Sequence, residues 1–238
     1  MSGVRALLMG GQACVFYGAA EFSRDLDLLV LADASSLNAL RAAMASLDAE
    51  TIAVPHLDGQ FLQRGHAVHF RCRREDVKAL RIDVMSKLRG SNTFVQLWSR
   101  RTTIEVEGIE IDMLSLPDLV VAKKTQRDKD WPMIRRLVEQ AYFSLPRVPD
   151  ENSLEFLFLE LRTPELLIRL ANQFPDAAQL YTLSRVPVAR ALEGNIEEVS
   201  AALSVEEAAE RGIDRAYWKP LKLEIEQLRR SRVKHEDE

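Results

Sequence analysis

The sequence has little of what marks several large classes of protein. Only two of its 238 residues are cysteines, Cys14 and Cys72, which excludes a disulfide-built scaffold and favours a reducing compartment. No apolar run approaches the roughly 20 residues that a membrane-spanning helix needs, and Met1–Gly11 is too short and too weakly basic for a signal peptide. The four histidines show no zinc-ligand spacing. We therefore expect a cytoplasmic protein with no membrane partner.

Charge of one sign is not in excess either. The chain has 32 Lys and Arg against 36 Asp and Glu, a formal net charge of −4, and is 47% hydrophobic. This composition and length predict a globular protein of one or two domains, and the mild acidity argues against a nucleic-acid partner. The charge is uneven, however, because residues 71–101 hold nine basic and three acidic side chains, a local +6. This basic stretch predicts a triphosphate or an anionic acceptor nearby, and it fits a solvated basic surface equally well.

The order of short elements predicts an α+β fold. Strands are expected from aliphatic or alternating runs at Val4–Met9, Leu26–Leu31, Thr51–Val54, Ala67–Cys72, Ala79–Met85, Thr102–Val106 and Ile109–Leu114. Helices are expected between them at Gln12–Tyr17 and Ala34–Asp48. After Pro117 strand signals nearly vanish, and helices are expected at Leu119–Lys124, Trp131–Phe143, Leu154–Leu161, Glu165–Gln173, Val205–Arg211 and Leu221–Arg232. We therefore predict a mixed β-sheet flanked by helices in residues 1–115 and a helical domain in residues 116–238.

Two aspartates at the start of an aliphatic strand are the most informative feature. In Ser23-Arg24-Asp25-Leu26-Asp27-Leu28, the alternation of a strand puts Asp25 and Asp27 on one side and the leucines in the core. Two adjacent carboxylates repel and are costly to desolvate without a cation, and a divalent metal is the simplest partner. The pair also fits two solvated aspartates at the open end of a strand.

Two further features would complete a site around this pair. Gly10 and Gly11 lie where a strand passes into a helix, and glycines there would let backbone N–H groups approach a phosphate closely. A tight turn alone would also require them. Asp83 interrupts an apolar strand pattern, which is unusual unless the acid is paired, coordinated or at a sheet edge. If its strand lies beside that of the pair, three carboxylates converge and could hold the paired Mg²⁺ ions used in phosphoryl-type transfer.

Together these motifs resemble the DNA polymerase beta-type nucleotidyltransferase superfamily. The matching pattern is Gly10-Gly11, then Ser23-x-Asp25-x-Asp27 opening an aliphatic strand, then Asp83 on a later strand. A further match is the helix-borne pair Lys123-Lys124 followed by Arg127-Asp128-Lys129-Asp130. The chain looks most like the small bacterial nucleotidyltransferases, including the abortive-infection toxin type, over roughly residues 4–138.

The resemblance implies a nucleotidyltransferase-type sheet and a role for each matched residue. Asp25, Asp27 and Asp83 would be the catalytic carboxylates that hold Mg²⁺ or Mn²⁺, and Asp83 would assist deprotonation of the acceptor hydroxyl. The implied nucleotide contacts in this part of the chain are Gly10, Gly11, Ser23 and Arg24. The arginine that the family usually carries shortly before the first aspartate is not clearly present.

The second motif implies contacts from the helical part. Lys123 or Lys124 would neutralise phosphate charge, and only one of them is expected to enter the site because adjacent helical positions point about 100° apart. Lys129 and Asp130 are second-rank site candidates. Asp128 is expected first of all to cap the helix that follows.

The implied reaction is an in-line attack of a hydroxyl on the α-phosphate of a nucleoside triphosphate, with release of pyrophosphate. The acceptor would be RNA, protein or a small molecule. Two other functions remain open: a non-catalytic nucleotide-binding or toxin–antitoxin interaction protein on the same fold, and a helical adaptor on an N-terminal scaffold. The three aspartates favour the enzyme, and the missing arginine favours a non-catalytic protein. The apolar stripes of the helical part are expected to form its core and the contacts of a homodimer.

Overall fold

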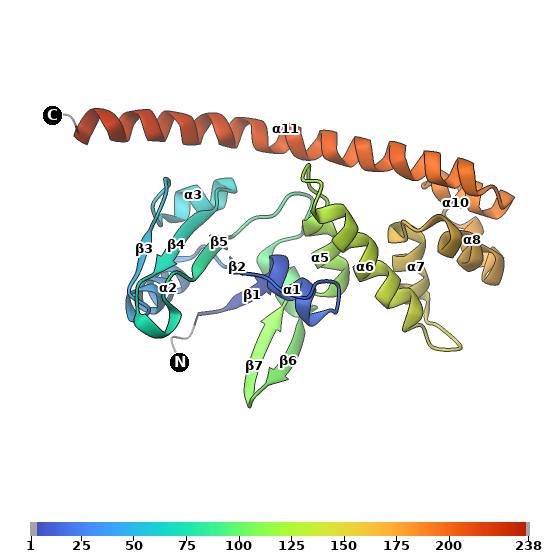
Figure 1. The fold of residues 1–238 in the computed structure, drawn as a ribbon, viewed down its shortest axis with the longest axis horizontal. Coiled ribbons are helices and arrows are strands. Elements are labelled where there is room, and N and C mark those ends of the chain that lie inside the picture. The colour runs from blue at the N-terminus through green and yellow to red at the C-terminus, as the bar shows by residue number, and fades with distance from the viewer. Residues whose placement is uncertain (1–3, 237–238) are drawn as a thin grey trace. The chain divides into compact units, whose positions relative to one another are not determined.

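The computed structural model describes residues 4–236, with side chains up to residue 231. The chain forms two compact units. The first contains the residues up to Ala122 together with those from Ala216 onward, and the second is Lys123–Arg215. The elements of both units are labelled in Figure 1. The division expected from the sequence, between residues 115 and 116, differs in that the end of the chain groups with the sheet.

The first unit is built on a seven-stranded mixed sheet. Its strands are β1 (Ala6–Met9), β2 (Asp25–Val30), β3 (Ala49–Thr51), β4 (Val68–Cys72), β5 (Arg81–Met85), β6 (Thr102–Val106) and β7 (Ile109–Met113). They lie in the order β3-β4-β5-β2-β1-β7-β6. Strand β2 is central, because it pairs antiparallel with β1 and parallel with β5. Each strand overlaps one expected from the sequence.

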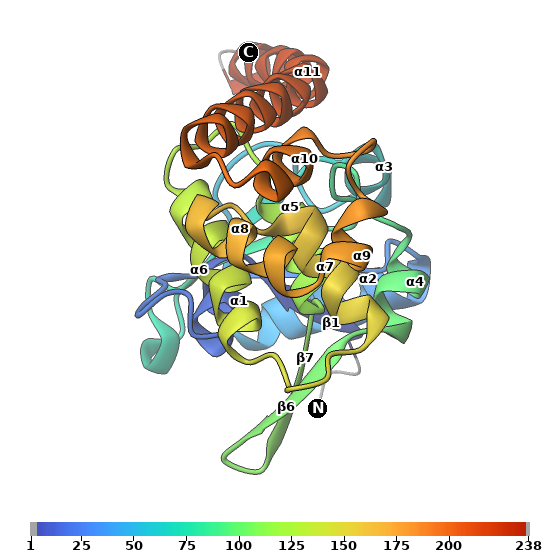
Figure 2. The ribbon, with the colours of Figure 1, turned by 90° about the vertical axis from the view of Figure 1, so that its right-hand side faces the viewer.

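Helices flank this sheet and form the second unit. Those in the sheet-containing part are α1 (Gly10–Phe16), α2 (Ala34–Ser46), α3 (Gly59–Arg64), α4 (Phe94–Ser99) and α5 (Leu116–Lys123). They are followed by α6 (Asp130–Phe143), α7 (Glu151–Glu160), α8 (Pro164–Gln173), α9 (Pro175–Gln179), α10 (Val186–Glu193) and α11 (Ile196–Glu236). Helix α8 contacts both α9 and α10, and α6 contacts α7 (Figure 2). The predicted α+β class, a helix-flanked mixed sheet followed by a helical region, is confirmed.

The last helix differs from the expectation. The separate helices predicted at 205–211 and 221–232 are parts of the single helix α11, which contains Pro220. Proline removes one backbone donor and normally interrupts a helix. Here Leu221 is buried and Glu224 binds Arg64 at the end of α3, and such tertiary packing outweighs local propensity. The short helices α3, α4, α9 and α10 were not predicted, because so few residues show no clear period.

One face of the sheet carries an apolar core of the first unit. The core residues are Val30, Leu37, Leu40, Met44, Leu62, Val68, Phe70, Cys72, Ile82 and Val84, which come from β2, β4, β5, α2 and α3. Strands contribute alternate residues to one face, so the residues between them point to the other. We call that other side of β2, β4 and β5 the carboxylate face; it carries Asp25, Asp27, His69, Arg81 and Asp83.

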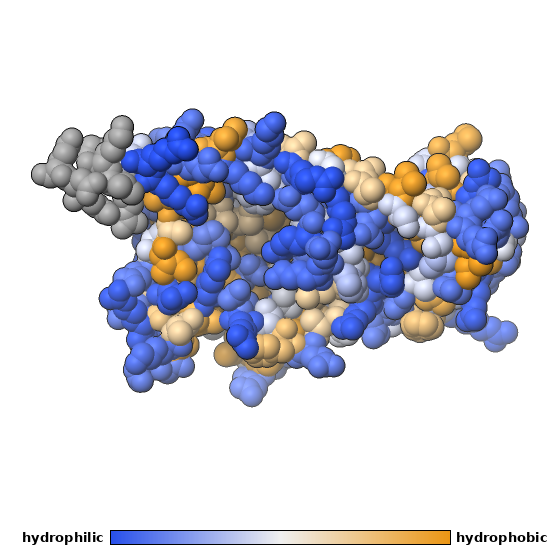
Figure 3. Space-filling model, turned by 45° about the horizontal axis from the view of Figure 1, so that its top comes forward, coloured by the Kyte–Doolittle hydropathy of each residue, from blue (hydrophilic) through white to orange (hydrophobic). Residues whose placement is uncertain are grey.

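Hydrophobic side chains on one face of the surface are interspersed with hydrophilic ones (Figure 3). On the face drawn in Figure 3 they form small groups among hydrophilic residues. In the second unit, Leu180, Leu183 and Val186 are exposed. Over residues 4–236, no helix combines the length and the apolar character needed to cross a membrane.

The turn after α3 is closely packed against α11. Gly65 ends α3 with φ +105°, and a β-carbon there would lie 2.5 Å from the hydroxyl oxygen of Tyr217. Next to it, Nε2 of His66 lies 2.7 Å from Oε2 of Glu224, and Nη2 of Arg64 lies 2.8 Å from Oε1 of the same residue. This turn therefore ties the end of the chain to the sheet-containing unit.

We expect Gly65→Ala to lower the free energy of unfolding by about 2 kcal/mol, from left-handed backbone strain and from displacement of Tyr217. Urea denaturation measures the change. The control is Gly194→Ala at another helix end, where φ is +75° and no atom lies within 4 Å of the added carbon, so about 1 kcal/mol of strain is expected. Equal losses in the two variants would show that the contact with α11 contributes nothing.

Candidate functional site

The glycine turn meets the aspartate pair at the end of β1. Met9 pairs with Asp27 across β1 and β2, and α1 begins at the next residue, Gly10, whose φ is +68°. A β-carbon at Gly10 would lie 1.8 Å from Oδ2 of Asp27, and one at Gly11 would lie 2.4 Å from Oγ of Ser23. No side chain fits at such distances, so both positions require glycine, and the backbone of the turn lies directly against the carboxylate.

The three aspartates lie on one face of two neighbouring strands. In the parallel pair of β2 and β5, Asp27 is opposite Asp83 and Asp25 is opposite Arg81. Residues directly opposite one another on paired strands point to the same side. The sequence left open whether the strand of Asp83 lies beside that of Asp25 and Asp27. In the structure the two strands are neighbours.

Asp83 is bound by two basic neighbours. Arg81 donates from Nε to Oδ1 of Asp83 at 2.8 Å and from Nη2 to Oδ2 at 3.0 Å. His69, which is opposite Asp83 on β4, places Nδ1 at 2.8 Å from the same Oδ1. Both carboxylate oxygens of Asp83 therefore have hydrogen-bonding partners on the carboxylate face.

These contacts favour the charged forms of Asp83 and Arg81. Burial raises the pKa of Asp83, but the hydrogen bonds with His69 and Arg81 outweigh burial and bring its pKa below the ordinary value. The hydrogen bond to Asp83 raises the pKa of Arg81, and the charges of Asp83, Asp25 and Asp27 raise it further against partial burial. Arg81 therefore interacts electrostatically with all three aspartates.

The chemistry of the donor set fits a hard divalent cation. Three carboxylates on one face supply the oxygen ligands that Mg²⁺ prefers, and the backbone of Gly10 lies directly against Oδ2 of Asp27. In the part of the chain that the structure describes, however, no group of three or more His, Cys, Asp or Glu side chains is arranged to hold a metal ion. Asp83 faces Arg81 and His69 instead, so a cation that used Asp83 as a ligand would compete with these partners.

The loop before β2 carries the other nucleotide contacts expected in this unit. Ser23 is partly buried, and its hydroxyl lies 3.3 Å from the carbonyl oxygen of Asp25. The carbonyl of Ser23 accepts a hydrogen bond from Nε2 of Gln12 at 2.8 Å, which ties this loop to α1. Arg24 and Phe22 are exposed on the same loop.

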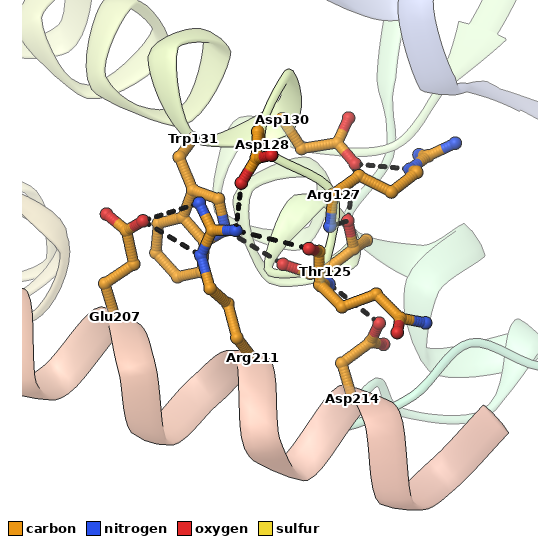
Figure 4. Close-up of polar contacts among 9 residues, drawn as sticks. Thr125, Arg127, Asp128, Asp130, Trp131, Glu207, Arg211 and Asp214 are labelled. Atoms are coloured by element: carbon orange, nitrogen blue, oxygen red, sulfur yellow. Dashed lines mark hydrogen bonds and ion pairs between the residues drawn. The ribbon is translucent and has the colours of Figure 1, made fainter. Parts of the chain in front are cut away.

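Asp130 is the centre of an ion-pair cluster in the second unit, and Figure 4 shows it beside Thr125 and Arg127. It has no exposed surface and accepts hydrogen bonds from Nζ of Lys123 at 3.2 Å, Oγ1 of Thr125 at 2.5 Å and Nε of Arg127 at 2.7 Å. Burial raises the pKa of Asp130, but the charge of Lys123 and the contacts with Thr125 and Arg127 outweigh it, so this pKa also lies below its ordinary value. Asp130 is therefore a buried carboxylate compensated by two cations.

The two lysines of the second motif both bind carboxylates. Lys123 is buried against Asp130, and Lys124 donates to Oε1 of Glu160 at 2.7 Å. Lys129 is exposed at the residue before α6. That Lys123 or Lys124 neutralises the phosphate charge of a nucleotide stays a prediction.

The capping role expected for Asp128 is wrong. The residue at the N-cap of α6 is Lys129, with no side-chain hydrogen bond to the helix. Asp128 is exposed and accepts a hydrogen bond from Nη1 of Arg211 at 2.5 Å, while Asp214 on the same helix accepts one from the backbone N–H of Gln126 at 2.9 Å (Figure 4). Asp128 thus binds α11, because α6 begins at Asp130, one residue later than a cap at position 128 requires.

Much of the basic stretch is neutralised by pairing. At least six of its nine basic side chains bind carboxylates, in the pairs Arg73–Glu50, Arg74–Asp76, Lys78–Glu75, Arg81–Asp83, Arg100–Asp118 and Arg101–Asp112. Three of these acids come from outside residues 71–101. The local +6 therefore overstates the positive charge that this surface offers to a ligand.

Three residues of the site were not assigned from the sequence. Arg81 was counted only within the basic stretch, although strand alternation puts it on the same face as Asp83. His69 lacked a signal, because its contact depends on the pairing of β4 with β5. Gln12 likewise lacked one, since its role is a hydrogen bond to a loop eleven residues away.

In comparisons with known proteins, this chain shows only a distant structural similarity. No family model matches the chain, and no curated protein matches it in sequence. Among solved structures, an antigenic nucleotidyltransferase-like protein from Paracoccidioides brasiliensis is similar over 74% of this chain and 83% of its own, with 17% identity and a TM-score of 0.40. A TM-score this low carries no argument for function, which has to come from the residues of the site.

Proposed function

We propose that this chain is a metal-dependent nucleotidyltransferase that moves a nucleotide from a nucleoside triphosphate to a hydroxyl acceptor. The observation that carries the proposal is the close approach of the glycine turn to the aspartate pair, with Gly10 against the carboxylate of Asp27 and Asp25 on the same face. A backbone that phosphates can approach then lies beside ligands for a cation. A turn with a purely structural role would not need the carboxylate of Asp27 at its contact.

In this proposal the residues of the carboxylate face have different roles. Asp25 and Asp27 would hold Mg²⁺ or Mn²⁺, with Asp83 as the third carboxylate. When bound, the metal would activate the acceptor hydroxyl and neutralise charge on the departing pyrophosphate. Asp83 would accept the proton of the hydroxyl, and the turn of Gly10 and Gly11, with the neighbouring Ser23, would orient the triphosphate.

The lysines of the second motif would contribute positive charge. We propose that Lys123 or Lys124 neutralises phosphate charge, and each would then share its ammonium group with the carboxylate it already binds, Asp130 or Glu160. Lys129 and Asp130 are proposed as supporting residues, Asp130 by holding Lys123 in place.

Label transfer from each α-labelled nucleoside triphosphate tests the proposal. The protein is incubated with Mg²⁺ or Mn²⁺ and with total RNA, lysate proteins or small hydroxyl compounds as acceptors. We expect transfer that EDTA abolishes and that Asp25→Asn and Asp83→Asn reduce on the order of a thousandfold, because electrostatic stabilisation supplies most of the catalysis. Asp76→Asn, an exposed acid off the carboxylate face, is the control and should retain transfer. Transfer that persists in both active-site variants would disprove the assigned site.

A non-catalytic nucleotide-binding protein, for instance a partner in a toxin–antitoxin pair, is the second candidate. It is favoured by the engagement of both oxygens of Asp83 with Arg81 and His69. If the protein has this function, we expect calorimetry to show binding of a nucleoside triphosphate, without label transfer to any acceptor.

A further inference from the structure

Arg81 lies among the aspartates of the carboxylate face. It lies opposite Asp25 in the sheet register and two residues before Asp83 on β5. Its guanidinium forms two hydrogen bonds with Asp83, with Nε at 2.8 Å from Oδ1 and Nη2 at 3.0 Å from Oδ2. This bidentate contact is the strongest form of charge-assisted hydrogen bond that a carboxylate makes with a side chain.

The same contact opposes the binding of another cation by Asp83. Both of its oxygens are used by Arg81, and Oδ1 is also shared with Nδ1 of His69. A metal ion that bound the same oxygens would compete with the guanidinium for their lone pairs. The side chain of Arg81 is 38% exposed whereas that of Asp83 is 16% exposed, so the guanidinium can move into solvent while the carboxylate stays on the face of the sheet.

We infer that Arg81 is a positioning residue that holds Asp83 in the metal-free protein and is displaced from it when a divalent cation binds. The inference rests on the proposed function for the identity of the metal ligands. It gives Arg81 two effects. The residue keeps the carboxylate of Asp83 ordered and compensated before the metal arrives, and it weakens metal binding because its hydrogen bonds must be given up.

Direct measurement of Mn²⁺ affinity, by calorimetry or by the electron paramagnetic resonance signal of free Mn²⁺, tests this competition without any substrate. We expect Arg81→Gln to bind Mn²⁺ about tenfold more tightly than the unmodified chain, because charge-assisted hydrogen bonds no longer oppose the metal. Arg81→Lys should fall between the two, since lysine keeps the charge but loses the bidentate geometry.

The matched control is Arg71→Gln. Arg71 is exposed and lies opposite Arg81 on β4, on the same face, so its removal takes away one positive charge but no hydrogen bond to Asp83. Its Mn²⁺ affinity should change less than about twofold, since exposed charges are screened by solvent. If Mn²⁺ affinity rose equally in Arg71→Gln and Arg81→Gln, the loss of one positive charge would explain the whole effect. That result would overturn the inference.

The remaining outcomes separate the inference from the proposed function. Unchanged Mn²⁺ affinity in Arg81→Gln, with measurable binding by the unmodified chain, overturns the inference and leaves the proposed function standing. Absence of Mn²⁺ binding in all variants overturns both. Tighter binding in Arg81→Gln without label transfer in any variant supports the inference and contradicts the enzyme. If Arg81→Gln does not fold, the affinity of Arg81→Lys decides: a value equal to that of the unmodified chain overturns the inference.

Discussion

Gly10→Ala is expected to abolish nucleotidyl transfer and to lower the free energy of unfolding by about 3 kcal/mol. The added β-carbon would lie 1.8 Å from Oδ2 of Asp27, 2.5 Å from its carboxyl carbon and 2.7 Å from its β-carbon. The carboxylate would have to move away from the glycine turn, and the left-handed φ of +68° adds backbone strain. Because Asp27 belongs to the proposed metal site, the same shift should weaken Mn²⁺ binding.

The control for this variant is Gly108→Ala. Gly108 has a comparable φ of +77°, and no atom lies within 4 Å of the added carbon. It should therefore lose only the strain, about 1 kcal/mol, and keep its transfer and Mn²⁺ affinity. Denaturation in urea, label transfer and Mn²⁺ binding are measured on both variants. Normal metal binding and transfer by folded Gly10→Ala would show that contact between the turn and Asp27 has no part in function.

Asp130→Asn is expected to lower the free energy of unfolding by about 4 kcal/mol, because it leaves a buried cation without its counter-charge. Lys123 is itself buried, and its Nζ lies 3.2 Å from the lost carboxylate oxygen. Asparagine has nearly the same shape, so the loss reports charge and hydrogen bonding rather than a cavity. Equilibrium denaturation followed by circular dichroism measures the change.

The neighbouring acid provides the control. Asp128 is exposed and binds Arg211 at the surface, and Asp128→Asn should change the unfolding free energy by less than about 1 kcal/mol. Similar losses in the two variants would contradict a dominant role for the buried pair.

The advantage of aspartate over asparagine at position 130 should depend on pH. The pKa of Asp130 is lowered in the folded chain by Lys123, Thr125 and Arg127 against the effect of burial. A carboxyl group with a lowered folded pKa stabilises fully above its unfolded pKa, about 4, and loses this contribution as the pH falls through the folded pKa. The difference between Asp130→Asn and the unmodified chain should therefore shrink below about pH 4. A difference that stays constant from pH 7 to pH 3 would contradict this cause.

Local pattern was sufficient for the strands and the longer helices. Short aliphatic runs such as Leu26–Leu31 form strands wherever both faces can be covered, and 130–143 has a helical period long enough to be recognised. The last helix was not predicted as one element, because Pro220 is a local signal for interruption. Burial of Leu221 and the contacts of Glu224 with Arg64 and His66 are long-range features that no local pattern contains.

The same distinction holds at the candidate site. Asp25 and Asp27 share a face by alternation alone, and the need for glycine at positions 10 and 11 is visible as a strand-to-helix passage. The contact of Gly10 with Asp27 is different, because it depends on the antiparallel pairing that puts Met9 opposite Asp27.

By itself, the sequence therefore determined the α+β class, the strand faces and the residue types that make a metal-dependent transfer chemically reasonable. Tertiary structure alone decided that β5 lies between β2 and β4, and hence that Asp83 lies opposite Asp27 on one side and His69 on the other. It also decided that Arg81 binds Asp83 and that many cations of the basic stretch have partners. The physical reason is that alternation is set by each strand's own backbone, whereas the neighbours of a strand are set by pairing between segments far apart in the chain.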